Sequence, residues 1–188
     1  MSRLLETIKC LDGACLHLDY HLKRLNSSRK TLGFDHPLKL QLAPPNTGLY
    51  RCRIVYEKEI ESIEYLPYTL RLPRSFKLLH SDLSYDLKYE NRDEINALFE
   101  QRQETEEIII IKNSLITDTS IANLCFFDGK NWLTPSKPLL KGTTRQRLLD
   151  AKKIKEANLS YTDIHKFSQI AVMNAMSDFQ IIENAIIS

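Results

Sequence analysis

LLKGTTRQRLL, residues 139–149, is the most informative segment of this 188-residue chain. Gly142, Thr143 and Thr144 stand where a loop is expected to become a helix. The first N–H groups of a helix have no partner within the helix, and the helix dipole adds partial positive charge at the same end. With two hydroxyl groups beside them, these N–H groups suit a phosphate. The alternative is that a threonine only caps the helix.

The segments around this motif predict a mixture of strands and helices. EEIIIIKN, residues 106–113, is typical of a strand buried on both faces, and NSLITDTS at 113–120 of a turn and a strand. NLCFFDGKNWLTP, residues 123–135, predicts a pair of strands around Asp128-Gly129. A helix is expected from Gly142 to about Ala157, and FSQIAVMNAMSDFQIIENAI at 167–186 is expected to begin as a strand and end as a helix.

The first half of the chain begins with a predicted hairpin around Asp12-Gly13. Leucines at helical spacing predict a helix from Asp19 to Leu32 that Gly33 ends, followed by a proline-rich loop. Residues 48–79 are rich in strand-forming residues, and residues 91–102 favour a helix. We therefore predict an α+β protein in two lobes, residues 1–83 and residues 84–188.

Composition excludes several classes of function. Lys and Arg number 26 and Asp and Glu 24, for a net charge of +2, so no nucleic-acid partner is expected. Four cysteines without a CxxC pair, and five histidines without metal-ligand spacing, predict reduced thiols and no metal site. The start MSRLLETIKC lacks the apolar core of a signal peptide, and no apolar run is long enough for a membrane span. We expect a cytoplasmic protein.

Several charged residues could bind an anionic ligand. Arg24, in HLKRL, lies on the charged side of the first predicted helix, where solvation is the alternative. Arg51 and Arg53, in YRCRIV, are two apart on a strand and share one face. They could receive an anionic substrate, or they could pair with Glu57, Glu59 and Glu61 on an exposed sheet face.

Lys88 and Asp118 complete the set of reactive side chains. Lys88, in SYDLKYENRDE, is surrounded by acids and resembles an ordinary surface lysine; it would need a lowered pKa and a carbonyl partner to act as a nucleophile. Asp118 precedes a hydrophobic strand, where a local turn is the simpler explanation. Taken together, these residues match a pyridoxal-phosphate site: a Schiff-base lysine, an acid for the ring nitrogen, and a cation with a helix terminus for the phosphate.

The order of these motifs resembles the class IV aminotransferases of fold type IV, over nearly the whole chain. This family includes branched-chain and D-amino-acid aminotransferases and aminodeoxychorismate lyase. The similar segments are ETIKCLDGACLHLDYHLKRLNSS, YDLKYENRDE, EEIIIIKNSLITDTSIANLCFFDGKNWLTP, LLKGTTRQRLL and VMNAM. The resemblance implies an N-terminal α/β lobe, a C-terminal pseudo-barrel lobe that binds pyridoxal 5'-phosphate, and a homodimer.

The resemblance also assigns roles to individual residues. Lys88 would form the Schiff base with the cofactor and then move protons at the substrate α-carbon. Asp118 would pair with the ring nitrogen, although the family usually has glutamate there. The phosphate would be held by Arg24, Thr143, Thr144 and the amide of Ala175. Arg51 or Arg53 would receive a substrate carboxylate.

The motifs do not separate a lyase from a transaminase, because both use the same cofactor site. Most family members carry an additional N-terminal stretch ahead of ETI that lines the substrate side, and this chain begins almost at ETI. Together with an arginine pair suited to a dicarboxylate, this favours 4-amino-4-deoxychorismate lyase, which makes pyruvate and the folate precursor 4-aminobenzoate. The alternative is a transaminase of branched-chain or D-amino acids.

Overall fold

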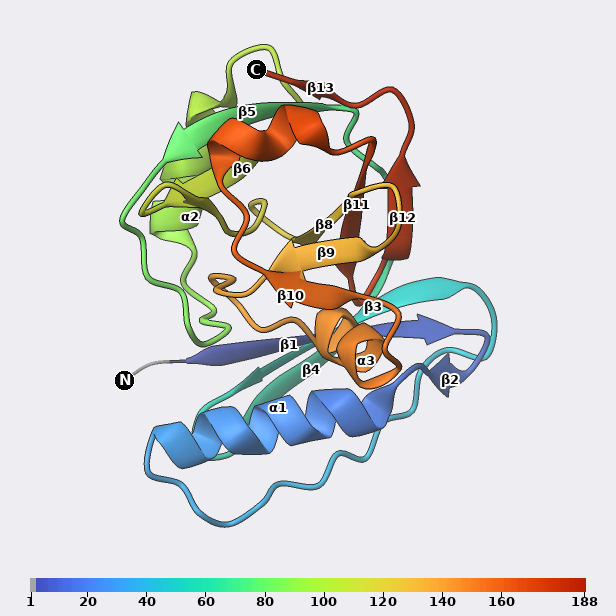
Figure 1. Ribbon diagram of the computed structural model, residues 1–188. Helices are drawn as coiled ribbons and strands as arrows, with labels where there is room; N and C mark the ends of the chain where they lie inside the picture. Colours follow the sequence, from blue (N-terminus) through green and yellow to red (C-terminus); the bar gives the residue numbers. More distant parts are fainter. Residues whose placement is uncertain (1–2) are drawn as a thin grey trace. The chain divides into compact units, whose positions relative to one another are not determined.

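The computed structural model describes residues 3–188 as two compact units, each an arrangement of strands and helices (Figure 1). The first unit comprises the described residues up to Leu70 together with Leu87–Asn91, and the second comprises Arg71–Asp86 and Arg92–Ser188. The chain therefore enters the second unit at Arg71, returns to the first for five residues around Lys88, and leaves it again at Arg92. The division predicted from the sequence has a single boundary, between residues 83 and 84.

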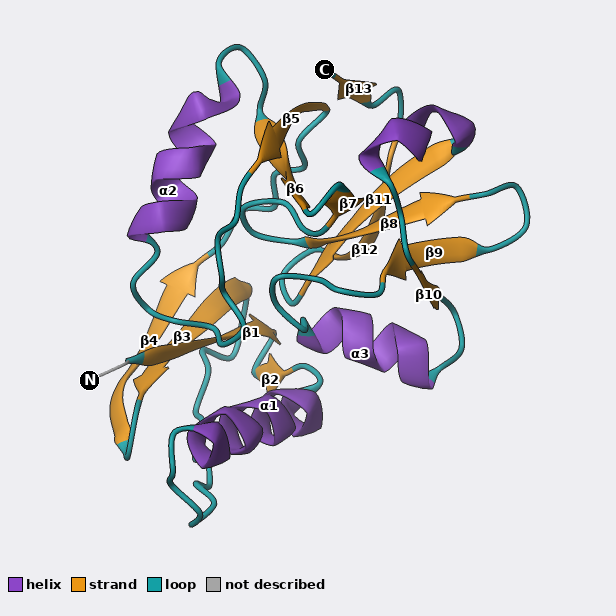
Figure 2. Ribbon diagram, turned by 60° about the vertical axis from the view of Figure 1, so that its left-hand side comes forward, coloured by secondary structure: helices purple, strands orange, loops and turns teal. Residues whose placement is uncertain are grey.

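The first unit is a four-stranded antiparallel sheet with a helix along one face (Figures 1 and 2). The strand order is β2-β1-β3-β4. Its elements are β1 (Leu4–Leu11), β2 (Ala14–Cys15), α1 (Leu18–Thr31), β3 (Leu49–Tyr56) and β4 (Ile60–Pro67). The predicted hairpin, first helix and following strands are confirmed, and Gly33, with φ +89°, lies just beyond the end of α1.

Alternation along β1 and β3 gives this sheet one apolar and one polar face. The buried side chains Ile8, Cys10, Cys52 and Ile54 form a core with Leu18 of α1. The intervening residues of the two strands point to the opposite face, because side chains alternate along a strand. Lys9, Arg51 and Arg53 lie on that face, with Lys9 directly opposite Arg51.

The second unit contains two sheets, in the orders β10-β9-β8-β11-β12 and β13-β5-β6-β7 (Figure 2). The elements of the five-stranded sheet are β8 (Asn123–Phe127), β9 (Trp132–Pro135), β10 (Lys155–Ala157), β11 (Gln169–Asn174) and β12 (Asp178–Ile182). Those of the other sheet are β5 (Ser75–His80), β6 (Glu107–Lys112), β7 (Leu115–Ile116) and β13 (Ile186–Ile187). The helices are α2 (Asp93–Phe99) and α3 (Thr143–Asp150), with 3-10 turns η1 (Glu100–Arg102) and η2 (Tyr161–Lys166).

One hydrophobic core unites these two sheets. Ile109 and Ile111 of β6 pack with Leu124 and Phe126 of β8 and with Val172 of β11. The four consecutive isoleucines of β6 are all buried, which confirms the prediction of a strand covered on both faces.

Two predictions for the second half of the chain were wrong. The helix expected to reach about Ala157 ends at Asp150, where Lys152 adopts a positive φ of 55° and residues 155–157 form β10. The expected final helix is absent from the described residues, and Asp178–Ile182 forms β12 against β11. Sheet pairing prevails over helix propensity here, because β11 offers a free edge to the apolar residues of β12.

Candidate functional site

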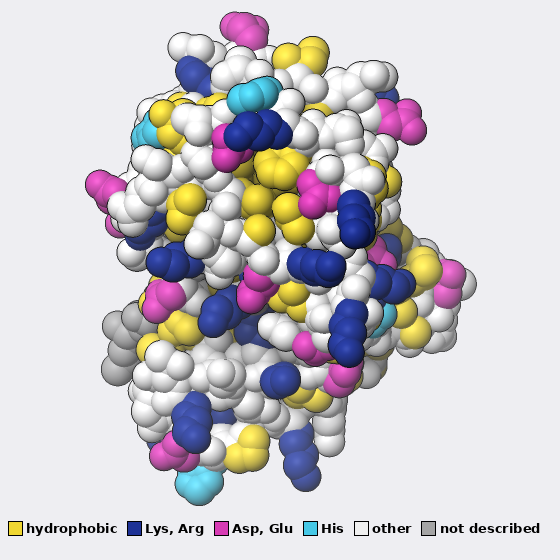
Figure 3. All heavy atoms as spheres, in the orientation of Figure 1, with side chains coloured by type: hydrophobic (Ala, Val, Ile, Leu, Met, Phe, Trp, Pro, Cys, Tyr) yellow, Lys and Arg dark blue, Asp and Glu magenta, His cyan; other side chains and the backbone are white. Residues whose placement is uncertain are grey.

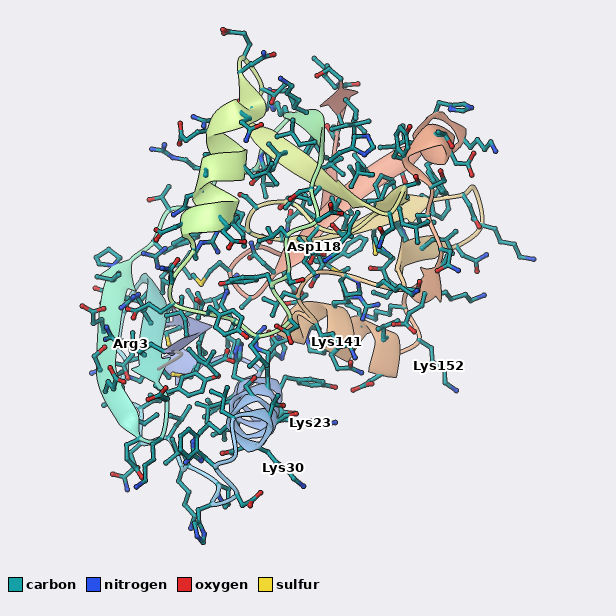
Figure 4. All side chains as sticks on the ribbon, turned by 90° about the vertical axis from the view of Figure 1, so that its left-hand side faces the viewer. Arg3, Lys23, Lys30, Asp118, Lys141 and Lys152 are labelled. Carbon is teal, nitrogen blue, oxygen red and sulfur yellow. The ribbon has the colours of Figure 1, made fainter. Side chains whose placement is uncertain are left out.

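Asp118 lies in the turn that joins β7 to β8, and its carboxylate is enclosed by protein. Its side chain is buried, with one hydrogen bond to each oxygen. The Nδ2 atom of Asn123 donates to Oδ1 at 2.7 Å, and the backbone N–H of Leu140 donates to Oδ2 at 2.9 Å. Leu140 belongs to the segment just before α3. Figure 4 labels Asp118 and the next residue of that segment, Lys141.

The surroundings of Asp118 change its acidity. Burial raises the pKa of Asp118 to about 7, and the hydrogen bonds from Leu140 and Asn123 and the charge of Arg145 only partly oppose this. A carboxyl group in such a place gains most from a cationic partner, because a buried charge needs compensation. The buried Asp118 carboxylate therefore fits the protonated ring nitrogen of pyridoxal phosphate.

The side chain of Asn123 also holds the segment before α3. Its Nδ2 atom donates to the carbonyl oxygen of Leu140 at 2.7 Å. A Cβ atom on Gly142 would lie 2.1 Å from Oδ1 of Asn123, so any other residue at this position would force the Asn123 side chain to move. Gly142 is the N-cap of α3 and Thr143 its first helical residue, and no side chain caps the helix. The simple capping role considered for the threonines is therefore not what the structure shows, and their role toward phosphate stays a prediction.

Ala175 lies in the turn after β11, and the preceding residue organises that turn. The Oδ1 atom of Asn174 accepts hydrogen bonds from the N–H groups of Met176 and Ser177, each at 2.9 Å, and from the Ser177 hydroxyl at 3.1 Å. Its Nδ2 atom donates to the carbonyl oxygen of Ile121 at 3.4 Å. The turn that carries Ala175 therefore lies beside the turn that carries Asp118.

A buried glutamate, which the sequence analysis did not single out, supports the Asp118 turn from β6. Glu107 accepts hydrogen bonds from the N–H of Ser120 at 3.3 Å and from its hydroxyl at 2.9 Å. Arg92 donates to the carbonyl oxygen of Ser120 at 2.8 Å. Burial raises the pKa of Glu107. The sequence did offer a signal for this residue. Glu107 stands at the start of an apolar strand, where a buried acid needs a polar partner.

Lys88 belongs to the first unit, where its backbone is joined to β1. Its carbonyl oxygen accepts a hydrogen bond from the N–H of Leu5 at 2.8 Å, and Tyr89 forms a β-bridge with Leu4. Leu87 and Tyr89 pack against the core that contains Leu4 and Leu25. Lys88 is thus held between two anchored neighbours. The acids beside Lys88 favour an ordinary surface lysine, whereas the backbone of this segment pairs with β1.

Arg24, predicted to hold the phosphate, makes a two-point contact with a buried acid of β1. Its Nε and Nη2 atoms donate to the two carboxylate oxygens of Glu6 at 2.7 and 2.6 Å. The Nδ1 atom of His21 lies 2.8 Å from Oε2 of the same carboxylate. Burial alone would raise the pKa of Glu6, but the charge of Arg24 and the hydrogen bonds from His21 and Arg24 outweigh it and lower the pKa to about 2. Glu6 thus orients Arg24.

Arg51 and Arg53 share a face of β3, but their surroundings differ. Arg53 is paired with Glu64 at 3.1 Å and with Glu90 at 2.6 Å. The Nε atom of Arg51 is buried and has no hydrogen-bond partner within residues 3–188. The acids that do pair with Arg53 are not the ones we had considered. Arg51, with Lys9 opposite, is therefore the cation better placed to receive an anion.

The predicted site residues divide between the two units. Arg24, Arg51, Arg53 and Lys88 lie in the first, and Asp118, Thr143, Thr144 and Ala175 in the second. On the face drawn in Figure 3, basic and acidic side chains are interspersed. Residues 3–188 include no cluster of three His, Cys, Asp or Glu side chains suited to a metal ion. No helix in the described part of the chain is long and apolar enough to cross a membrane.

Two kinds of comparison identify the class of protein. The fold is that of fold type IV enzymes: a "Putative amino-acid aminotransferase" from Mesorhizobium loti matches with a TM-score of 0.84 over the whole of both chains, at 21% identity. Residues 62–185 match the family "Amino-transferase class IV". The chain therefore belongs to the class IV aminotransferases, and it is a pyridoxal-phosphate-dependent enzyme.

Similar chains extend over nearly its whole length. A crystal structure of a "putative 4-amino-4-deoxychorismate lyase" from Haemophilus somnus 129pt is 34% identical, with a TM-score of 0.85 over 94% of this chain and 97% of that one. An "Uncharacterized protein" of Haemophilus influenzae is 39% identical over 94% of this chain and 99% of its own length. A "Putative aminodeoxychorismate lyase" of Schizosaccharomyces pombe is 29% identical over 82% of this chain and 76% of its own length.

Proposed function

We propose that this enzyme is a 4-amino-4-deoxychorismate lyase that releases pyruvate and 4-aminobenzoate. The observation that carries the proposal is Arg51. Its buried Nε atom has no hydrogen-bond partner among the described residues, and it lies on a sheet face that also bears Lys9. Two cations directly opposite each other on neighbouring strands repel, and a ligand with carboxylates would relieve that repulsion. The similar chains named as aminodeoxychorismate lyases support the same substrate class.

The resemblance to class IV aminotransferases supports the choice of residues that would hold pyridoxal phosphate. Lys88 would carry it covalently, Asp118 would face its ring nitrogen, and Arg24, Thr143, Thr144 and the Ala175 amide would contact its phosphate. When bound, the cofactor supplies an aldehyde that takes up amines and a ring that withdraws electrons from the adjacent carbon. The buried Asp118 carboxylate would keep that nitrogen protonated.

The remaining steps fall to the residues of this chain. The amine of Lys88 would remove the proton from the substrate carbon that bears the amino group. Expulsion of the enolpyruvyl side chain as pyruvate then leaves an aromatic ring, which makes the step favourable. The two products together contain every atom of the substrate, so this reaction requires no second substrate. Arg51 would orient a carboxylate of the substrate throughout.

The test is to supply purified enzyme and pyridoxal phosphate with aminodeoxychorismate as the only substrate. We expect pyruvate and 4-aminobenzoate to appear in equal amounts, without an added 2-oxo acid. A transaminase of branched-chain or D-amino acids is the alternative, and it would form glutamate only when an amino acid and 2-oxoglutarate are both present. Glutamate formation without pyruvate release from aminodeoxychorismate would reject the lyase. A homodimer and a cytoplasmic location stay predictions.

A further inference from the structure

Two cysteines stand directly opposite each other across the hairpin formed by β1 and β2. Cys10 and Cys15 are register partners, and their Sγ atoms are 3.1 Å apart. Both are free thiols. A third thiol, Cys52, lies in the same core cluster as Cys10. The proposed lyase chemistry does not use these sulfur atoms.

The hairpin geometry is suited to a bond between these two sulfur atoms. The N–H of Leu16 donates to the carbonyl oxygen of Lys9 at 2.8 Å, so the next pair along the ladder, Cys10 and Cys15, is a non-hydrogen-bonded pair. The Cα atoms of such a pair are about 4.5 Å apart, which is within the range of about 4.4–6.8 Å that disulfides span. A bond length of about 2.0 Å then requires only a small movement of the sulfur atoms.

The two thiols differ in their access to solvent. Cys15 is half-buried on a short edge strand next to the exposed residues Asp12 to Ala14, whereas Cys10 is 1% exposed. Burial and the neighbouring Cys15 raise the pKa of Cys10, and burial raises the pKa of Cys52 to about 11. An oxidant from solution therefore meets Cys15 first, and Cys10 is placed to react second.

We infer that Cys10 and Cys15 form a reversible disulfide site that reacts with small disulfides such as oxidised glutathione. The Cys15 thiolate attacks one sulfur of oxidised glutathione, the S–S bond breaks, and one glutathione leaves as its thiolate. Cys10, after losing its proton, attacks the Cys15 sulfur of this mixed disulfide and expels the second glutathione. The protein loses two electrons and two protons, and oxidised glutathione becomes two molecules of reduced glutathione.

The experiment exposes the full-length folded protein to oxidised glutathione, alkylates the remaining thiols and digests with trypsin. Cleavage after Lys9 and Lys23 places Cys10 and Cys15 in one peptide, while Cys52 leaves in a separate dipeptide with Arg53. We expect the 10–23 peptide to lose the mass of two hydrogen atoms and to take up no alkylating agent. Dithiothreitol should restore both alkylations. Cys125, buried in the second unit, serves as the internal control and should remain a thiol.

Three other results would overturn the inference. They are a cross-link between the 10–23 peptide and Cys52, a glutathione adduct on Cys15 that persists in the wild type, and no reaction before the protein unfolds. Variants separate the two steps. Cys10→Ser should accumulate glutathione on Cys15, and Cys15→Ser should leave Cys10 unmodified. Because the readout is peptide mass, its failure is distinct from failure of the proposed lyase activity.

Discussion

The Oδ1 atom of Asn123 occupies the space that a Cβ atom on Gly142 would need, since the two would be 2.1 Å apart. The same asparagine donates to Asp118 and to the carbonyl oxygen of Leu140. One side chain therefore connects the acid proposed for the cofactor ring with the helix terminus proposed for its phosphate.

Gly142→Ala should displace the Asn123 side chain and weaken its hydrogen bond to Asp118. We expect a loss of about 1–3 kcal/mol in the free energy of unfolding, because the added methyl group overpacks a buried site. Urea denaturation measures this loss. The double variant Gly142→Ala/Asn123→Ala should lose less than the sum of the two single changes, since Asn123→Ala removes the atom that clashes. Strict additivity would contradict the contact.

Asp118→Asn should change how the stability of the cofactor-free protein depends on pH. Because burial raises the pKa of Asp118 from 3.8 to about 7, the folded protein keeps a proton that the unfolded chain releases. The free energy of unfolding should then fall as pH rises from about 4 to about 7, by an amount on the order of 4 kcal/mol. Asp118→Asn should flatten this part of the curve in urea titrations. A curve unchanged by the substitution would show that Asp118 is ionised throughout.

Glu6→Gln should weaken the first unit at neutral pH and remove part of its acid sensitivity. The pKa of Glu6 is lowered from 4.5 to about 2, so its contribution is present above pH 4.5 and is lost as pH falls toward 2. This contribution is on the order of 3 kcal/mol. Circular dichroism during acid titration measures the effect. Glu61→Gln is the control, because Glu61 pairs with Arg3 on the surface, and an equal loss there would contradict the assignment.

Arg51→Gln should raise the KM for aminodeoxychorismate about ten- to hundredfold and leave stability nearly unchanged, because its buried Nε has no hydrogen-bond partner within residues 3–188 to lose. Arg53→Gln is the matched control. It breaks the pairs with Glu64 and Glu90, and so it should lower the free energy of unfolding by about 1 kcal/mol with a smaller change in KM. Steady-state kinetics and urea denaturation of both variants distinguish the two roles. The reverse pattern would assign the carboxylate to Arg53.

Lys88→Ala should abolish turnover while leaving the fold intact. In the wild type, borohydride should attach the cofactor permanently to the tryptic peptide that runs from Leu78 to Arg92 and contains Lys88. The variant should show no such mass increase, and Lys152→Ala, at an exposed position, should behave as the wild type does. Labelling of any other lysine in the wild type would show that Lys88 is not the reactive one.

Much of the candidate site follows from local patterns and their order along the chain. Asp12-Gly13 predicts the hairpin, and leucine spacing predicts α1, since both depend on neighbouring residues. Helix α3 begins where Gly142 and the two threonines indicate, but the predicted length of the helix was wrong. Its end depends on residues 155–157, which pair with β9, the strand that precedes the helix, so that Lys155 lies opposite Leu133.

The amino-acid sequence alone determined the family, the order of the candidate site residues and most strand positions, because these depend on residue type and spacing. Only the tertiary structure separated Arg51 from Arg53, since the acidic partners of Arg53 come from β4 and from the Lys88 segment. The tertiary structure also showed the hydrogen bond from Ser120 to Glu107, the close approach of Asn123 to Gly142, and the contact between the sulfur atoms of Cys10 and Cys15. Each of these contacts depends on how segments pair in space, which residue spacing does not specify.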